Sequence, residues 1–193
     1  MKVVGFVGSP RIGGNAETLL KQVFTGCEKA GASEVNFFNL NMMHIKGCQA
    51  CYYCREHEAC AIKDDMQKIY SDIKDADAVV IGSPIYMFQM SAQTKLMVDR
   101  FLAFLGPDFK TRLGGGKDTI LVFTQGQPDV NTFKPYIDHT VKMYEFLGFR
   151  VKDVIIGGGL MEKEDAGKNT ELMKKAEEAG SRLIKNLAAA SKS

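Results

Sequence analysis

Short apolar runs alternate with amphipathic stretches throughout this chain, and no other feature of the sequence limits the fold as strongly. The apolar runs are rich in Val, Ile, Leu and Phe and carry few polar residues, which is typical of parallel strands covered on both faces. We expect strands at residues 3–8, 35–40, 78–83, 119–124 and 151–156. The alternation therefore predicts an α/β fold, in which helices cover both faces of a doubly wound, five-stranded parallel sheet to give three layers.

The intervening stretches place apolar residues on one face at helical spacing. The first of them carries Leu19, Val23 and Cys27 on such a face, so we interpret this cysteine as a core residue. Further helices are expected from about residue 65 and at 91–105, 133–147 and 169–190. Five β-α units favour the flavodoxin-like strand order 2-1-3-4-5. Because no linker or repeat interrupts the pattern, residues 1–193 are expected to form a single domain.

Charge and hydropathy exclude several classes of partner. The formal net charge is +2 and the lysines are scattered over the expected helix surfaces, so we predict neither a nucleic-acid partner nor an anionic membrane. No apolar stretch is long enough to span a membrane, and the first strand is too short for a signal peptide. We therefore expect a cytoplasmic protein, in which clustered cysteines more often ligate metal or do redox work than form disulfides.

The loop between the first strand and the first helix has the chemistry of a phosphate site. Its glycines allow a tight backbone turn, its polar side chains offer donors, and the following helix presents free N–H groups. Neither the Walker A nor the GxGxxG pattern is present, which argues against ATP and a tightly bound dinucleotide. The alternative is a plain turn with an exposed arginine. The predicted binding residues are Ser9, Arg11, Gly13, Asn15, Ala16, Glu17 and Thr18.

Two further segments follow strands and are expected at the same sheet edge. The one after the third strand offers aromatic and thioether surface beside backbone amides, which suits the flat ring of a flavin, although such turns are as often core packing. The one after the fourth strand offers a hydroxyl and side-chain amides for the polar edge of that ring. The predicted ring-binding residues are Ser83, Pro84, Ile85, Tyr86, Met87 and Phe88 in the first segment, and Thr124, Gln125 and Gly126 in the second.

Four cysteines fall within thirteen residues, in a loop expected at about residues 41–64. They are Cys48, Cys51, Cys54 and Cys60. This compact run favours a 4Fe-4S cluster, because two-residue gaps let a loop wrap successive thiolates around the iron corners. A structural zinc site, for which His57 is the one nearby substitute ligand, and free thiols or disulfides are the alternatives.

Taken together, these motifs resemble the NADPH-dependent FMN reductase superfamily, and within it the iron-sulfur flavoproteins of methanogenic archaea and other anaerobes. The resemblance is carried by GSPRIGGN, by GCQACYYCREHEAC leading into DDM, and by SPIYMFQMSAQTKLMVDR, and it extends to about Gly126. It implies an FMN whose phosphate is held by the first loop, at Ser9, Arg11, Asn15 and Thr18, and whose ring lies against residues 83–88. It also implies a 4Fe-4S cluster on the four clustered cysteines.

By this resemblance the protein is an FMN-dependent oxidoreductase that passes electrons between cluster and flavin. NAD(P)H or ferredoxin is the implied donor, and flavin, quinone or oxygen species are the acceptors. An NAD(P)H-dependent FMN or quinone reductase without a cluster is one alternative, and a non-enzymatic redox carrier or sensor is another. We predict no catalytic acid or base, since His44, His57 and His139 stand alone.

Position along the chain suggests how cluster and flavin are arranged. The cysteine loop follows the second strand, so we expect the cluster to share one sheet rim with the flavin, or to reach a neighbouring subunit. A solvent-exposed rim rarely carries as many large apolar residues as we expect here, namely Met87, Phe88, Met90 and Phe101. Their number predicts a homodimer or homotetramer that buries them. Asp99 and Arg100 are read as a solvated pair on a helix face.

Overall fold

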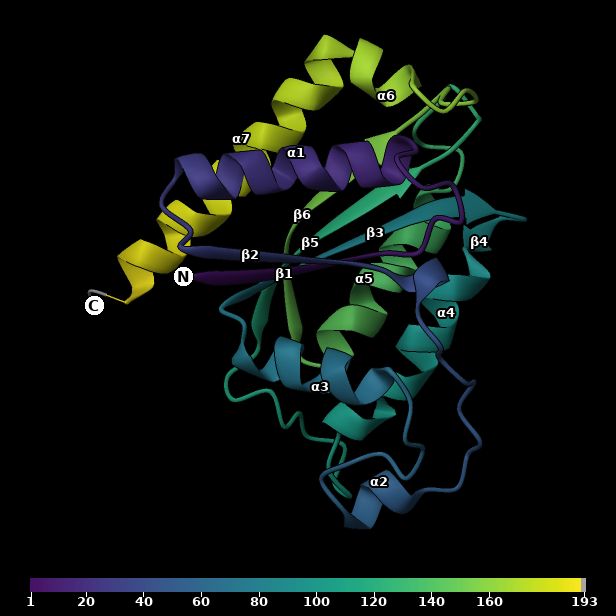
Figure 1. Cartoon of the computed structure of the whole chain (residues 1–193), viewed down its shortest axis with the longest axis vertical. Helices are drawn as coiled ribbons and strands as arrows, with labels where there is room; N and C mark the ends of the chain where they lie inside the picture. The colour runs from purple at the N-terminus through teal and green to yellow at the C-terminus, as the bar shows by residue number, and fades with distance from the viewer. Residues whose placement is uncertain (192–193) are drawn as a thin grey trace.

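Five parallel strands form the middle layer of the computed structural model, which describes residues 1–191 (Figure 1). The parallel strands are β1 (Lys2–Val7), β2 (Glu34–Asn39), β3 (Ala78–Tyr86), β5 (Lys117–Thr124) and β6 (Phe149–Gly157), and a short sixth strand, β4 (Gln89–Met90), is antiparallel to β3. The helices are α1 (Asn15–Lys29), α2 (Tyr53–Glu56), α3 (Met66–Asp75), α4 (Ala92–Asp99), α5 (Lys134–Phe146), α6 (Asp165–Lys168) and α7 (Thr170–Ala190). Short 3₁₀ turns follow β2 at Leu40–Met42 and α4 at Arg100–Phe104.

The strand order is β2-β1-β3-β5-β6, which confirms the flavodoxin-like order expected from the sequence. All neighbours along this path pair in parallel. β4 is an addition to the expected sheet: it pairs antiparallel with the end of β3, so that Ile85 faces Met90 and Tyr86 faces Gln89. The carboxyl ends of β1, β3 and β5 consequently lie beside one another.

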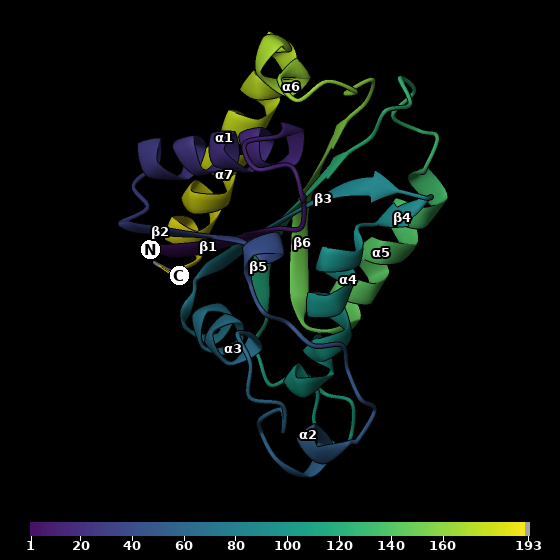
Figure 2. The ribbon, with the colours of Figure 1, turned by 45° about the vertical axis from the view of Figure 1, so that its right-hand side comes forward.

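Helices cover both faces of the sheet, and Figures 1 and 2 show α1 and α7 on one side and α3, α4 and α5 on the other. The sheet has an apolar core on each face, and successive residues of β1 point into opposite cores. Val3 packs in the core under α1 and α7, whereas Val4 packs in the core under the other helices. α1 and α7 approach so closely that a Cβ at Gly26 would lie 1.9 Å from the carbonyl oxygen of Glu177. Glycine at that position therefore sets the spacing of one helix layer.

The segment from 83 to 105 differs from the sequence-based expectation. β3 continues to Tyr86, because Pro84 stays paired with Thr124 of β5 and the last two residues of the strand pair with β4. The expected helix at 91–105 ends as an α-helix at Asp99, with Ser91 as its N-cap, and continues as a 3₁₀ turn. Met90 and Phe101, which were expected at a subunit interface, are already buried within this chain.

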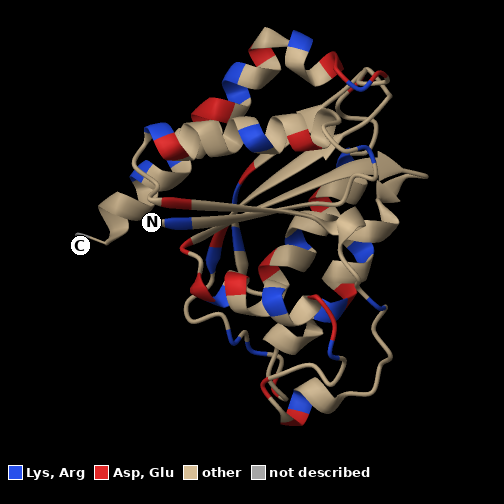
Figure 3. Ribbon diagram, in the orientation of Figure 1, with Lys and Arg blue, Asp and Glu red and all other residues tan. Residues whose placement is uncertain are grey.

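Acidic and basic residues are interspersed on the outer faces of α1, α3 and α7 (Figure 3). Several are paired one helical turn apart, as in Lys68 with Asp72 and Lys174 with Glu178. Within the described residues, no helix combines the length and apolar character that crossing a membrane requires.

Candidate functional site

A cavity of about 240 Å³ opens where the loops after β1, β3 and β5 meet. It lies at the carboxyl edge of the sheet, where α/β sheets of this type bind ligands. Ten of its lining residues belong to the three predicted segments: Ser9, Arg11, Asn15, Ala16, Pro84, Ile85, Tyr86, Thr124, Gln125 and Gly126. Leu160 and Met161 complete the lining from the loop after β6. The structure thus brings together three segments that the sequence could only propose separately.

The loop after β1 is shaped around the start of α1. The backbone N–H of Arg11 donates to Ser9 Oγ at 3.1 Å, and that of Gly14 donates to the Arg11 carbonyl at 3.0 Å. Gly13 has a φ of +65°, a conformation that favours glycine. Gly14 is the N-cap residue, and no side chain within residues 1–191 caps the helix there. The first-turn amides of α1 are therefore available to an anion at the cavity.

The loop after β6 covers this phosphate loop, a contact the sequence did not predict. Arg11 Nη1 donates to the Met161 carbonyl at 2.8 Å, and Asn15 Nδ2 donates to the Glu162 carbonyl at 2.7 Å. Asn15 Oδ1 also accepts the backbone N–H of Ala166 at 2.9 Å. In this conformation the Asn15 amide joins two loops, and its role as a phosphate donor stays a prediction.

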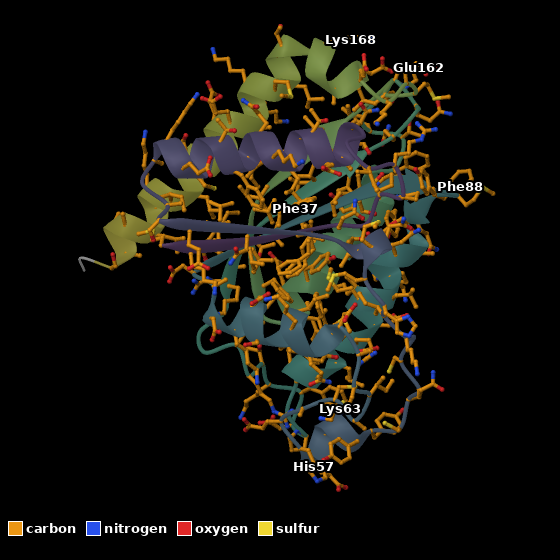
Figure 4. The ribbon with its side chains drawn as sticks, viewed as in Figure 1. Phe37, His57, Lys63, Phe88, Glu162 and Lys168 are labelled. Atoms are coloured by element: carbon orange, nitrogen blue, oxygen red, sulfur yellow. The ribbon has the colours of Figure 1, made fainter. Side chains whose placement is uncertain are left out.

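Lys163 brings a second cation to the phosphate loop. A Cβ at Gly13 would lie 3.8 Å from Lys163 Nζ, so this ammonium lies beside the loop, and Figure 4 labels its neighbour Glu162 in the same part of the molecule. Nothing in the local sequence marks Lys163 as a site residue. Its position depends on the contacts that Arg11 and Asn15 make with main-chain oxygens, which every residue type carries.

Several predicted site residues lie outside the cavity lining and stabilise the loops instead. Glu17 Oε2 accepts the Gly13 N–H at 2.8 Å, and Lys21 lies 2.6 Å from the other oxygen. Although burial alone would raise the pKa of Glu17, these two partners lower it below its ordinary value, so a carboxylate stays there. Ser83 Oγ is buried and accepts the Ser91 N–H at 3.0 Å. Thr18 is half-buried and lies one turn into α1.

Met87 and Phe88 form the exposed tip of the β3–β4 hairpin. Their φ angles are +44° and +71°, in a two-residue turn where Asn and Gly are usual and larger side chains are strained. Their exposed fractions are 88% and 71%, and Figure 4 shows Phe88 projecting outward from the hairpin. Neither residue lines the cavity, whereas Pro84, Ile85 and Tyr86 do. Strained, exposed apolar residues beside a cavity are typical of a functional rim.

Gln125 lines the cavity and carries an unpaired acceptor in its side chain. Its Nε2 donates to the carbonyls of Gln127 and Asp129 at 3.1 and 2.8 Å, which fixes the side chain. Its Oε1 is buried and has no hydrogen-bond partner within residues 1–191. A buried unpaired oxygen is costly unless a ligand donates to it, and the polar edge of an isoalloxazine ring carries an N–H donor. The cavity therefore fits a flavin by a criterion independent of sequence motifs.

The cysteine loop carries the second candidate site. Cys48 and Cys51 are exposed, while Cys54 and Cys60 are buried against the core under α3. Burial raises the pKa of Cys54, and the charges of the other three clustered cysteines raise it further. Among residues 1–191, no three His, Cys, Asp or Glu side chains are close enough to hold a metal ion. The donor set is that of a 4Fe-4S site, but in this conformation it is open.

The same loop is anchored by a buried ion pair. Arg100 lies 2.9 Å from Asp64, and both side chains are at most 1% exposed. The guanidinium also donates to the carbonyls of Lys46 at 2.8 Å and Ile62 at 3.4 Å, which joins the two ends of the loop. Arg100 is therefore not the solvated partner of Asp99 that the sequence suggested. Asp99 pairs instead with Lys95 on the helix surface.

The expected shared rim for cluster and flavin is also wrong within one chain. The cysteine loop leaves the sheet at the 3₁₀ turn after β2, but both views show α2 beneath α3, well away from the start of α1 (Figures 1 and 2). Figure 4 likewise places His57 at the end of the molecule remote from Glu162. The loop tip instead contacts the segment before β5, where Arg55 donates to the Pro107 carbonyl and packs over Phe109.

Comparison with known proteins identifies the family to which the chain is related. A sequence profile described as NADPH-dependent FMN reductase matches residues 1–125. An iron-sulfur flavoprotein from Methanocaldococcus jannaschii is 34% identical over 116 residues, which are 60% of this chain and 60% of that protein. Another from Archaeoglobus fulgidus is 29% identical over 187 residues, 95% of this chain and 79% of that protein. The chain thus spans about three fifths of the length of the first relative.

Solved structures support the fold. An FMN-dependent NADH-azoreductase from Bacillus anthracis, solved in complex with FMN, superposes with a TM-score of 0.69 at 15% identity. The match covers 95% of this chain and 100% of that one, and at such low identity it shows the fold alone. Sequence profile and fold agree with the resemblance found in the sequence. The chain therefore belongs to the NADPH-dependent FMN reductase family, a family of FMN-dependent oxidoreductases.

Proposed function

We propose that the protein binds FMN in the cavity at the carboxyl edge and works as an electron-transferring oxidoreductase. The observation that carries this proposal is the convergence of three loops on one cavity, with free helix amides at one end and the unpaired Gln125 oxygen among its lining residues. The first-turn amides of α1, together with Arg11 and Lys163, supply positive potential for the phosphate. Pro84, Ile85 and Tyr86 provide a wall for the ring.

FMN, when bound, accepts two electrons as a hydride and can release them singly. The chain's part is to hold and shield it. Gln125 would hold the polar edge of the ring through its unpaired Oε1, because the bonds that its Nε2 donates to Gln127 and Asp129 fix the side-chain amide. The strained Met87–Phe88 turn sets the rim past which a donor must enter.

The cysteine loop is the proposed site of a 4Fe-4S cluster on Cys48, Cys51, Cys54 and Cys60. Four thiolates in one loop match the ligands of such a cluster, and the names of the archaeal relatives agree with it. A cluster and a flavin in the same protein would together connect one-electron with two-electron chemistry. We propose NAD(P)H or ferredoxin as donor and flavin, quinone or an oxygen species as acceptor.

The second candidate function is a NAD(P)H-dependent FMN or quinone reductase without a cluster, which the open arrangement of the thiols favours. A non-enzymatic carrier or sensor is the third. Anaerobic purification with assays for FMN, iron and sulfide separates the first two. Steady-state turnover with NADPH, compared with reduced ferredoxin, tests the third, since a carrier or sensor shows no multiple turnover with a pyridine nucleotide.

Replacing Arg11 by alanine is expected to weaken FMN binding by about 1–2 kcal/mol, roughly tenfold, because a charge-assisted contact to phosphate is lost. Titration of the apoprotein with FMN, followed by flavin fluorescence, measures the change. Riboflavin, which has no phosphate, should bind both proteins equally. Lys110→Ala, an exposed cation near the cysteine loop, is the control and should leave FMN affinity unaltered. Equal FMN affinity in Arg11→Ala and the parent protein would remove Arg11 from the phosphate site.

We also propose a homodimer or homotetramer, on the evidence of the hairpin tip. Met87 and Phe88 are exposed in the single chain and strained, a combination that burial by a second copy would relieve. Multi-angle light scattering should show an oligomer for the FMN-loaded protein. Met87→Asn with Phe88→Gly, which suits the turn better, should shift it towards monomer without lowering its melting temperature. A parent protein that is monomeric with FMN fully bound contradicts the proposal.

A further inference from the structure

The segment between β6 and α6, residues 158–164, lies across the start of α1, and we call it the strap (Figure 1). Its first part is fixed to the loop after β5. The Leu160 N–H donates to the Gln125 carbonyl at 3.0 Å. Met161 packs so closely on that loop that a Cβ at Gly126 would lie 2.4 Å from its sulfur. The strap therefore begins against the loop that is proposed to hold the flavin ring.

The second part of the strap is fixed to the phosphate loop. Asn15 is 7% exposed and uses both ends of its amide: Nδ2 donates to the Glu162 carbonyl at 2.7 Å, and Oδ1 accepts the Ala166 N–H at 2.9 Å. Arg11 donates to the preceding carbonyl, that of Met161, at 2.8 Å. The strap thus connects the two loops that are proposed to hold the two ends of one ligand.

Asp165 shapes the strap from the start of α6. Its Oδ2 accepts the N–H of Met161 at 3.0 Å and the N–H of Glu162 at 2.7 Å. These are the two residues whose carbonyls meet the phosphate loop, so one carboxylate orients the turn that carries Lys163. Asp165 is not among the residues that line the cavity, and it can act on a ligand there only through the strap.

Lys163 brings an ammonium to the phosphate loop. A Cβ at Gly13 would lie 3.8 Å from Lys163 Nζ, and Lys163 forms no ion pair with a carboxylate of residues 1–191. Three nearby carboxylates have other partners: Glu17 pairs with Lys21, Glu164 lies 3.9 Å from Lys168, and Asp165 accepts the two strap amides. Glu162 is the acidic residue of the strap that has no ion pair in the described chain, so a test of Lys163 has to include it.

We propose that Lys163 is a binding residue that makes the cavity prefer flavins with a terminal phosphate, and that Asp165 is the positioning residue that holds the strap in place for it. The inference rests on the proposed FMN function. A phosphate monoester carries about two negative charges at neutral pH, which a second cation beside Arg11 helps to match, whereas riboflavin carries none. Because Lys163 is exposed, its contribution is modest and decreases with salt.

The first test is titration of the apoprotein with FMN and with riboflavin, followed by flavin fluorescence at low and at high salt. Lys163→Gln should weaken FMN binding roughly threefold to fivefold at low salt and less at high salt, while riboflavin affinity stays the same. Lys168→Gln, which removes a cation of α6 that already lies beside Glu164, should leave FMN affinity unaltered. Glu162→Gln, which removes the unpaired negative charge, should not weaken FMN binding.

The second test addresses Asp165. Asp165→Ala should weaken FMN binding about as much as Lys163→Gln does, and Asp165→Asn, which keeps an acceptor oxygen, should restore most of the affinity. Hydrogen exchange of the flavin-free protein supplies a measurement that needs no ligand. Amides of residues 159–164 should exchange faster in Asp165→Ala than in the parent, while those of α3 stay unchanged.

The possible failures can be told apart. A parent protein that binds neither flavin defeats the proposed FMN function and the selectivity with it. A parent that binds FMN, together with an unaltered preference for FMN over riboflavin in Lys163→Gln, defeats only the role of Lys163. Faster exchange of the strap in Asp165→Ala without any loss of FMN affinity defeats the role of Asp165. If Asp165→Ala does not fold, Asp165→Glu, whose longer side chain displaces the carboxylate, takes its place.

Discussion

Serine at Cys54 is expected to abolish cluster retention while FMN stays bound. A 4Fe-4S centre that loses one of four thiolates becomes labile, and Cys54 is buried at the point where the loop meets the core. Iron and acid-labile sulfide per FMN should fall to near zero in anaerobically purified protein. Serine at Cys48, Cys51 or Cys60 should do the same, because all four are the proposed ligands of one cluster. FMN should remain, since its cavity is built from other loops.

Cys27→Ser is the matched control for this experiment. Cys27 is buried on the other side of the sheet, where its Sγ lies 3.6 Å from the Gly180 carbonyl between α1 and α7. Burial raises its pKa to about 12, so it stays a neutral thiol. The variant should keep full iron and sulfide and lose about 1 kcal/mol of stability. Stoichiometric zinc without sulfide in the parent protein would instead establish a structural metal and contradict the cluster.

The fold was predictable because burial on both faces gives each central strand an unbroken apolar run. The long C-terminal helix was equally readable: Asn169 at its expected start caps α7 by accepting the Leu172 N–H at 3.0 Å. The extension of β3 to Tyr86 was not readable, since Ser83 and Pro84 interrupt the apolar pattern. Pro84 is held by pairing with β5, about forty residues further along the chain, and Ile85 and Tyr86 are held by pairing with β4. Periodicity within one segment contains no information about either pairing.

The candidate site was predictable where backbone geometry demands particular residue types. Glycines and a cation after β1 pointed to a phosphate loop, and ten of the predicted residues line one cavity. Met161 and Lys163 were not predicted, because their loop is held by a hydrogen bond from Arg11 to a main-chain oxygen, and every residue type carries such an oxygen. The starting point of the cysteine loop was readable, but its direction was not. That direction is set by Arg100, whose partner Asp64 lies 36 positions away.

Removing the buried Arg100 side chain is expected to produce the largest loss of stability. Arg100→Met keeps much of the volume but leaves Asp64 buried and unpaired, which costs about 3–5 kcal/mol. Urea unfolding of metal-stripped protein at neutral pH, followed by circular dichroism, measures this. Asp99→Asn is the adjacent control: its pair with Lys95 is exposed, so the change should cost at most about 0.5 kcal/mol. Equal costs for the two variants would contradict the role given to Asp64 and Arg100.

The same pair predicts a dependence of stability on pH. Burial alone would raise the pKa of Asp64, but hydrogen bonds from Arg100 and from the Lys46 backbone lower it below its ordinary value. Because the folded pKa lies below the unfolded value of about 3.9, the unfolded chain binds more protons between the two. The free energy of unfolding that ionised Asp64 contributes is present above about pH 5 and is lost as pH falls through the folded pKa. The double variant Asp64→Asn with Arg100→Met should lose this pH-dependent part of the stability. It should also be more stable than expected from adding the losses of the two single variants, because neither partner is left buried and unpaired.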